Sequence, residues 1–238
     1  CKRLFFFCAL HYMPYFWATM ALVYQKEIQD SATLAIWKIE ESAEVLVAKL
    51  QLDEQEQAYF ESLGQHMRQL HWLATRVLLR TLLQTEHYID CKADAHGKPY
   101  LVNFPHRISL SHSYDYAAVM ISETRAVGID IELIKPKIEA LAPKFLTDTE
   151  RSFIDPDHAV AHLYSCWAAK EAVYKLQGKS GISFKEHIHL QPFAYAENGT
   201  LRALLQSKED TATLDVAFER FGSYVLAYVC GEEEAHAE

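Results

Sequence analysis

The sequence predicts an α+β protein made of two α+β halves, and three observations support this. The chain has 238 residues, enough for two small domains that each bury a core. Amphipathic helices are predicted over residues 68–83 and 158–176, and each is followed by several strand-like runs rather than by the alternation of strand and helix that a parallel sheet requires. Half of the residues (50%) are hydrophobic, which is typical of a globular protein.

In the first half, the strongest signal is the helix over residues 68–83. Apolar residues recur at i, i+3, i+7 and i+8 from Leu70, so one face of this helix should pack on a core. Upstream, residues 33–39 alternate with the period of a strand, and residues 52–63 read as a polar helix. Further strands are predicted over residues 99–102, 108–111 and 117–122.

The second half is predicted to begin with a strand over residues 127–133. Thr147 and Glu150 have the spacing of a capping box, which indicates a short helix starting there. The helix over 158–176 should end near Gly178. The remainder, 188–229, alternates as strands with turns expected at Asn198–Gly199 and Phe221–Gly222.

We place the boundary between the halves near residue 124, giving an N-terminal half over 20–123 and a C-terminal half over 124–238. Residues 1–19 are expected to be a non-native or disordered extension. They combine a basic start with a short apolar run, as a secretory signal does, but His11 and Pro14 interrupt that run. The run is also too short to span a membrane, so no membrane association is expected.

Composition excludes several classes of function. The net charge of -9 argues against a nucleic-acid-binding protein, which needs a basic face to neutralise phosphates. An anionic substrate would therefore have to be bound by local clusters of basic residues. The five cysteines form no C-x-x-C pair, so neither a disulfide framework nor a zinc site is indicated.

The pattern richest in chemistry joins a strand to a helix. Asp130 and Glu132 alternate on a strand and share one face, and Glu171 and Lys175 stand at i and i+4 on a helix. Adjacent carboxylates in a cleft call for a cation, and their oxygens suit Mg²⁺. The alternative for Glu171 and Lys175 is an exposed ion pair that contributes only a few tenths of a kcal/mol.

These residues resemble a known family. Gly-Ile-Asp-Ile-Glu at 128–132 and Trp-x-x-Lys-Glu-Ala-x-x-Lys at 167–175 are similar to the signature motifs of the 4'-phosphopantetheinyl transferase superfamily, in the two-domain type that activates surfactin synthetase. Further matches occur in the family's order over roughly residues 66–190. The resemblance implies two similar halves related by a pseudo-twofold axis, with the active site in the cleft between them.

The resemblance also implies a reaction: transfer of 4'-phosphopantetheine from coenzyme A to a serine of an acyl or peptidyl carrier protein. Mg²⁺ would be held by Asp130, Glu132 and Glu171 and would neutralise the pyrophosphate. Glu171 is the expected general base, directly or through water, although a carboxylate beside Mg²⁺ and Lys175 should have a lowered pKa. Lys175 would steady the leaving phosphate.

The coenzyme A phosphates are expected to be bound by basic and polar side chains of both halves. Arg68 and Arg76 lie eight residues apart, about two turns along one helix face, which suits one anionic ligand, although two solvated arginines would show the same spacing. In this helix His71 and Thr75 replace the family's usual glutamate and glycine. The full expected set is Arg68, Arg76, Lys98, Ser111, His112 and Lys175.

The carrier protein is expected to dock on a local basic cluster, Lys135, Lys137 and Lys144, since carrier proteins present an acidic helix. These could equally be ordinary surface lysines. His158 and His162 have zinc-like spacing but lack a nearby third ligand, so a structural role is expected for them.

Two other functions stay open: a non-catalytic coenzyme A-binding protein, and a Mg²⁺-dependent pyrophosphohydrolase of coenzyme A. The family further implies a monomer in the cytoplasm that serves fatty acid, polyketide or nonribosomal peptide biosynthesis.

Overall fold

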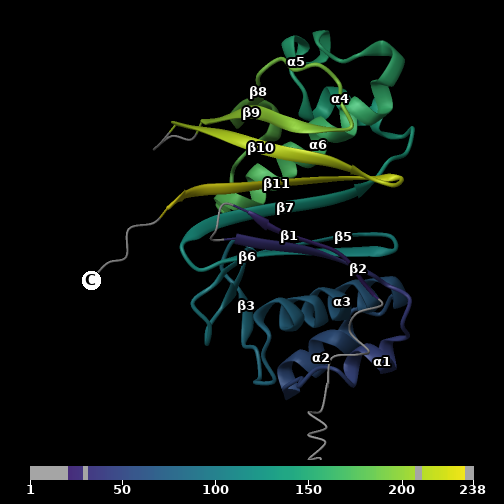
Figure 1. Ribbon diagram of the computed structural model, residues 1–238, viewed down its shortest axis with the longest axis vertical. Helices are drawn as coiled ribbons and strands as arrows, with labels where there is room; N and C mark the ends of the chain where they lie inside the picture. Colours follow the sequence, from purple (N-terminus) through teal and green to yellow (C-terminus); the bar gives the residue numbers. More distant parts are fainter. Residues whose placement is uncertain (1–20, 29–31, 207–210, 234–238) are drawn as a thin grey trace, which may run out of the picture.

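The protein has four layers, helix, sheet, sheet and helix, stacked along its longest axis (Figure 1). The computed structural model describes residues 21–28, 32–206 and 211–233. The extension predicted over residues 1–19 lies outside the described residues. One hydrophobic core lies between each outer helix layer and its sheet, and a third lies between the two sheets. The predicted α+β class is confirmed.

The N-terminal layers consist of an antiparallel sheet in the order β1-β2-β6-β5 and three helices. The long helix α3 packs its buried leucines against β2 and β6. A two-stranded ribbon, β3-β4, lies beside it. The bounds are β1 (Leu22–Ile28), β2 (Ala32–Lys38), α1 (Ala43–Val47), α2 (Glu54–Ser62), α3 (His66–Leu83), β3 (Cys91–Ala93), β4 (Pro99–Leu101), β5 (Arg107–Ser113) and β6 (Tyr116–Ser122).

The C-terminal layers consist of a sheet in the order β7-β11-β10-β9-β8, covered by α6 and shorter helices. The bounds are β7 (Arg125–Leu133), α4 (Ile138–Phe145), α5 (Asp148–Ser152), η1 (Pro156–His158), α6 (Ala159–Gln177), α7 (Phe184–His187), β8 (Ile188–Leu190), β9 (Asn198–Gln206), β10 (Thr211–Phe221) and β11 (Tyr224–Glu233). Among the described residues, no helix is long and apolar enough to cross a membrane.

Most predicted elements are present with small shifts in their ends, and the Thr147 capping box forms as expected.

One turn was predicted wrongly. Asn198 and Gly199 form the start of β9, where both residues pair with β10. The helix α4 was not predicted. It contains Pro143 in its last turns, and proline normally argues against a helix interior. The division at residue 124 falls in the short connection between β6 and β7 and stays a prediction.

The two sheets are joined by a ladder of serine hydroxyls. Ser109, Ser111 and Ser113 project from β5 toward β7, and their Oγ atoms accept hydrogen bonds from the amides of Ile129 (3.0 Å), Ile131 (3.2 Å) and Leu133 (3.1 Å). These amides lie on the edge of β7 that does not pair with β11. Since buried amides need partners, the ladder supplies what a neighbouring strand would otherwise supply.

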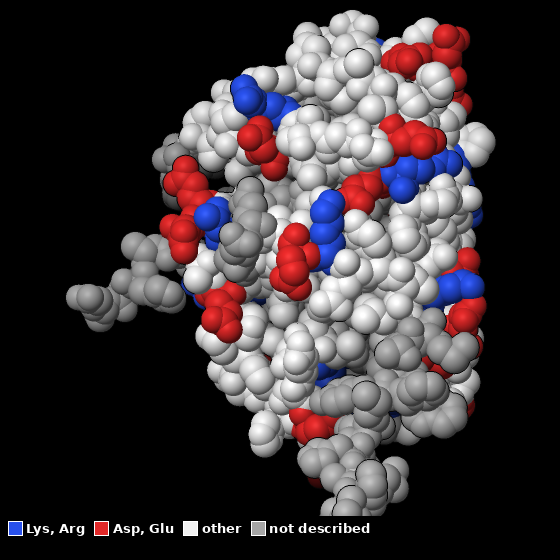
Figure 2. Space-filling model, viewed as in Figure 1, with Lys and Arg blue, Asp and Glu red and all other residues white. Residues whose placement is uncertain are grey.

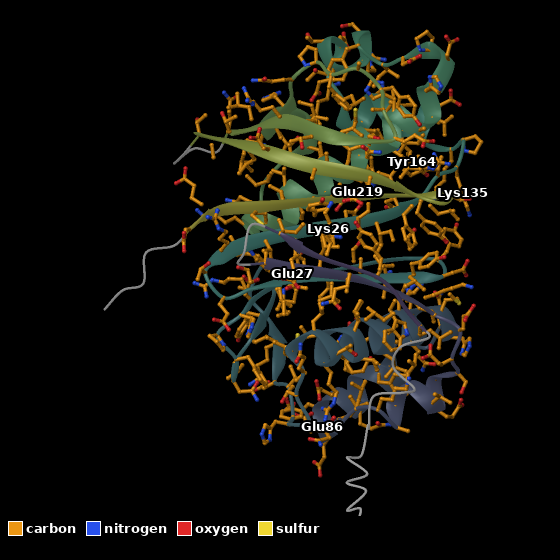
Figure 3. The ribbon with its side chains drawn as sticks, in the orientation of Figure 1. Lys26, Glu27, Glu86, Lys135, Tyr164 and Glu219 are labelled. Atoms are coloured by element: carbon orange, nitrogen blue, oxygen red, sulfur yellow. The ribbon has the colours of Figure 1, made fainter. Side chains whose placement is uncertain are left out.

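Ionic contacts also join the halves on the opposite flank. Lys26 of β1 and Glu219 of β10 point toward one another (Figure 3), with 2.6 Å between Lys26 Nζ and Glu219 Oε1. Tyr24 and Tyr228 donate to the same carboxylate. On the face shown in Figure 2, positive and negative side chains of the described residues lie interspersed.

Candidate active site

A cleft of about 610 Å³ lies where α3, the turn before β4, β5 and the end of α6 meet. Five of the predicted coenzyme A-binding residues line it: Arg68, Arg76, Lys98, His112 and Lys175. They come from both halves of the chain, so folding brings together residues up to about a hundred positions apart. A cleft of this size with several basic groups on its walls is suited to a polyanionic ligand.

The C-terminal wall depends on the close approach of α6 to β7. A Cβ atom added to Gly128 would lie 2.0 Å from the carbonyl oxygen of Ala172, so only glycine allows this spacing. The approach places Lys175 over the strand, where its Nζ donates to Asp130 Oδ1 at 2.7 Å and to the carbonyl of Ile129 at 3.1 Å. The sequence predicted that these elements meet but gave no reason for Gly128.

Asp130 is the buried centre of the predicted carboxylate group. Its Oδ1 accepts from Ser111 (2.8 Å) as well as from Lys175, whereas its Oδ2 is buried and has no hydrogen-bond partner in the structure. Glu132 accepts from Trp167 Nε1 (3.1 Å) and from Ser113 (3.2 Å). Neutral side chains therefore donate to both carboxylates, and the one positively charged donor, Lys175, contacts Asp130.

The protein's own groups raise the pKa values of both glutamates. Burial, followed by the charge of Asp130, raises the pKa of Glu171 to about 7, while Lys175 acts in the opposite direction. Burial and Asp130 also raise the pKa of Glu132. A lowered pKa was expected for Glu171. The protein's own groups raise it instead, because desolvation and the neighbouring carboxylates outweigh Lys175.

The fit of a metal ion can be tested on these groups. Within the described parts of the chain, no cluster of three or more His, Cys, Asp or Glu side chains is gathered closely enough to hold one. The donor chemistry nevertheless suits a hard cation: Asp130 Oδ2 is buried without a partner, and burial, followed by the charge of Asp130, raises the pKa values of Glu132 and Glu171. A cation there would compensate all three carboxylates.

Two of the predicted phosphate ligands have other partners in the structure. Ser111 is buried on the face of β5 that contacts β7, where it bonds Asp130 and the Ile131 amide, and it does not line the cleft. Alternation along β5 places His112 in the cleft instead. Lys98 lines the cleft, and its Nζ donates to the carbonyl of Leu176 at 2.6 Å, at the carboxyl end of α6.

The N-terminal wall contains residues that sequence reasoning missed. Trp72 lies between Arg68 and Arg76 on α3, and the guanidinium of Arg76 stacks on its indole at 3.6 Å. Tyr59 packs against the same indole from α2, at 5.8 Å between ring centroids. The i, i+4, i+8 spacing of residues 68, 72 and 76 was the available signal, since it places all three on one helix face.

Other residues singled out from sequence lie outside the cleft. Lys135 Nζ lies 3.6 Å from the ring centre of Tyr114, and Lys135 lies near Tyr164 at one end of the C-terminal sheet (Figure 3). His162 is buried and its Nδ1 accepts from the amide of Asp155, whereas His158 is exposed. This agrees with the structural role expected for His162.

Comparisons with known proteins agree with this arrangement. Residues 126–229, from β7 to β11, match the family model described as the 4'-phosphopantetheinyl transferase superfamily. The resemblance inferred from the motifs is therefore confirmed for this segment, which carries Asp130, Glu132, Glu171 and Lys175.

Individual relatives carry the same name. The chain is 33% identical over 122 residues to the 4'-phosphopantetheinyl transferase AcpT of Salmonella typhi, covering 49% of this chain and 62% of that protein. It is 34% identical over 126 residues to AcpT of Escherichia coli strain K12, covering 50% and 64%. It is 31% identical over 117 residues to the transferase Sfp of Bacillus subtilis strain 168, covering 45% and 51%. The match thus spans less than two thirds of each relative.

Proposed function

We propose that this protein transfers 4'-phosphopantetheine from coenzyme A to a serine hydroxyl of an acyl or peptidyl carrier protein. The observation that carries the proposal is the convergence, on one cleft of about 610 Å³, of four basic side chains and His112. One of these basic residues, Lys175, donates a hydrogen bond to Asp130, which is one of the three predicted metal-binding carboxylates. The names of the relatives support the same reaction.

The basic residues of the cleft are proposed to bind the anionic groups of coenzyme A. Arg68, Arg76 and Lys98 bind the anionic groups of coenzyme A along the cleft, and His112 donates to a phosphate oxygen. Lys175 holds the pyrophosphate at the end of the cleft where the carboxylates lie, and it stabilises the charge that develops on the departing phosphate.

Glu171 is the group suited to accept the proton of the carrier serine, directly or through water. Without metal its pKa is about 7. A bound cation would lower that pKa, so the carboxylate would be ionised at neutral pH and able to accept the proton. Asp130, Glu132 and Glu171 would hold Mg²⁺. When bound, Mg²⁺ would neutralise the pyrophosphate and orient it for in-line attack. Ser111, Ser113 and Trp167 orient the two strand carboxylates by donating to them.

The carrier protein is proposed to approach beside Lys135, because this end of β7 leads directly to Glu132. An acidic helix would meet Lys135, Lys137 and Lys144 there. Charge reversal at Lys135 and Lys137 should then raise the KM for carrier protein far more than the KM for coenzyme A. Equal effects on both substrates would count against this docking site. The family resemblance suggests a monomer, and coenzyme A as substrate suggests the cytoplasm.

The deciding experiment is intact-mass spectrometry of an apo acyl carrier protein incubated with this protein, coenzyme A and Mg²⁺. The expected result is a mass gain of one phosphopantetheine that requires metal and is lost in Glu171→Gln. Glu186→Gln, an exposed glutamate on α7, is the matched control and should be active. Coenzyme A that binds without transfer would indicate a binding protein, and its cleavage without carrier modification would indicate a hydrolase.

A further inference from the structure

An imidazole ring on the wall of the cleft, His112, stacks on a second imidazole behind it, His71. The centroids of His71 and His112 lie 4.2 Å apart with 15° between their planes. His71 belongs to α3 and His112 to β5, so the contact joins the helix to the sheet beneath it. His71 Nε2 lies 2.7 Å from the carbonyl oxygen of Tyr114, and because a carbonyl only accepts, Nε2 carries the proton of this bond. His71 is therefore fixed in orientation and tautomer.

The surroundings of His112 disfavour its charged form. Burial, then the charges of His71 and Lys175, lower the pKa of His112 to about 4, while Asp130 on β7 acts in the opposite direction. At neutral pH the ring is therefore uncharged, although it lies among cations. Besides His112 and Lys175, the titratable groups on the cleft wall are Tyr59, Arg68, Arg76, His96, Lys98 and Tyr174.

We propose that His71 is a positioning residue for His112: bonded to the carbonyl of Tyr114 and stacked on the His112 ring, it holds that ring in the orientation that meets an anion in the cleft. This rests on the proposed function in one respect, that the anion is a phosphate group of coenzyme A. A phosphate next to His112 favours the imidazolium, so binding takes up one proton from solvent at this ring. Occupied and empty clefts then differ in the charge of His112.

Stacking contributes an amount that an experiment can measure. Aromatic pairs contribute about 0.5–1.5 kcal/mol beyond the area they bury, equivalent to roughly two- to tenfold in an equilibrium constant. If that contribution orders the binding form of His112, its loss should appear in the affinity for coenzyme A. Loss of the stacking should leave kcat unchanged, since His71 contacts His112 and Tyr114 and touches neither Glu171 nor Lys175.

The test uses two replacements that separate the contacts of His71. His71→Phe keeps a stacking ring but removes the charge and the bond to Tyr114, and His71→Gln keeps a donor but removes the ring. His66→Gln is the matched control, because His66 is an exposed histidine of the same helix. Each variant is titrated with coenzyme A and, separately, with inorganic pyrophosphate. The His112 ring signal is followed by NMR from pH 4 to pH 8.

The expected results differ between variants. In His71→Phe the pKa of free His112 should rise only in part, because the contribution of His71 is lost while burial, the largest cause, and Lys175 remain. In His71→Gln the affinity for coenzyme A should fall about three- to tenfold, with a higher KM, an unchanged kcat and an unchanged Tm. Proton uptake on binding should be visible in the unmodified protein and in His66→Gln.

Two results would overturn the inference: a His112 titration that neither His71 variant alters, or a fall in kcat and Tm with no change in affinity. The second would assign His71 to packing alone. The NMR titration of the free protein needs no turnover. If no carrier protein is modified but His71 still governs His112, the transferase proposal fails and this inference stands.

Discussion

Lys170 Nζ lies 2.7 Å from Glu150 Oε1, and both side chains are almost completely buried. The same ammonium donates to the carbonyls of Phe145, Phe184 and Ile188, and thus joins the end of α4, α7 and β8 to α6. The other oxygen of Glu150 caps α5 by accepting from the amide of Thr147. Lys170 therefore fixes the helix that carries Glu171, although it lies outside the cleft.

Replacing Lys170 with methionine should destabilise the protein by about 3–5 kcal/mol, because Glu150 would be left as an uncompensated buried charge. Urea denaturation measures this loss. Lys144→Met, at an exposed lysine of α4, should stay within about 0.5 kcal/mol of the unmodified protein. Equal stability of the two variants would show that the buried pair contributes nothing net.

The stability of the protein should fall as pH rises from about 4.5 to about 7 and level off above that. Folding raises the pKa of Glu171 from an ordinary value of 4.5 to about 7, so the neutral carboxyl stabilises the fold fully below pH 4.5. This contribution is lost as pH rises through about 7. Thermal melts with a chelator present, from pH 5 to pH 9, should show the decline.

Glu171→Gln should lose part of that decline, and the raised pKa of Glu132 accounts for the remainder. Added Mg²⁺ should reduce the decline in the unmodified protein, because a cation favours the ionised carboxylates. An identical pH dependence in Glu171→Gln would contradict the assignment.

Gly128→Ala should separate α6 from β7. The new methyl group would meet the Ala172 carbonyl at 2.0 Å, and overpacking of this kind costs about 1–3 kcal/mol or more. A shift of about 1 Å between Glu171 and Asp130 can lower a rate by about 100-fold, so transfer should fall by that order. Gly231→Ala, where the nearest atom is 3.4 Å away, is the control for a tolerated methyl group. Mass spectrometry and thermal melts together make the comparison.

Ser109→Ala should cost about 1–3 kcal/mol, because the buried amide of Ile129 would lose its only side-chain acceptor in the ladder. Ser109 also lines the cleft, but unlike Ser111 it makes no hydrogen bond to a carboxylate, so kcat should not change. Ser111→Ala should cost a similar amount and also lower activity, since Ser111 donates to Asp130. Ser152→Ala, at an exposed serine, is the control. A loss of kcat in Ser109→Ala would contradict this division.

The carboxylates and Lys175 could be predicted because their spacing is local. Alternation places Asp130 and Glu132 on one face of a strand, and a helical turn places Glu171 beside Lys175. That the strand and helix meet came from the family motifs, and the bond from Lys175 to Asp130 supports it.

Other features depend on contacts between distant segments, which periodicity does not encode. The partner of Lys98 is a helix end some 80 residues away, and the acceptor role of the β5 serines depends on which strand lies beneath them. Ser111 was expected to bind phosphate in the cleft because the family resemblance pairs it with His112. The alternation of the strand directs it to the opposite face.

The serine ladder also has a consequence for dividing the chain. A strand edge whose amides are already bonded by hydroxyls cannot recruit a strand from another molecule. A fragment beginning at residue 124 would present the amides of Ile129, Ile131 and Leu133 without acceptors, beside the apolar face that now meets the other sheet. Such a fragment should associate with itself. In the whole chain, the first half covers these amides and this apolar face, and so protects the second half from aggregation.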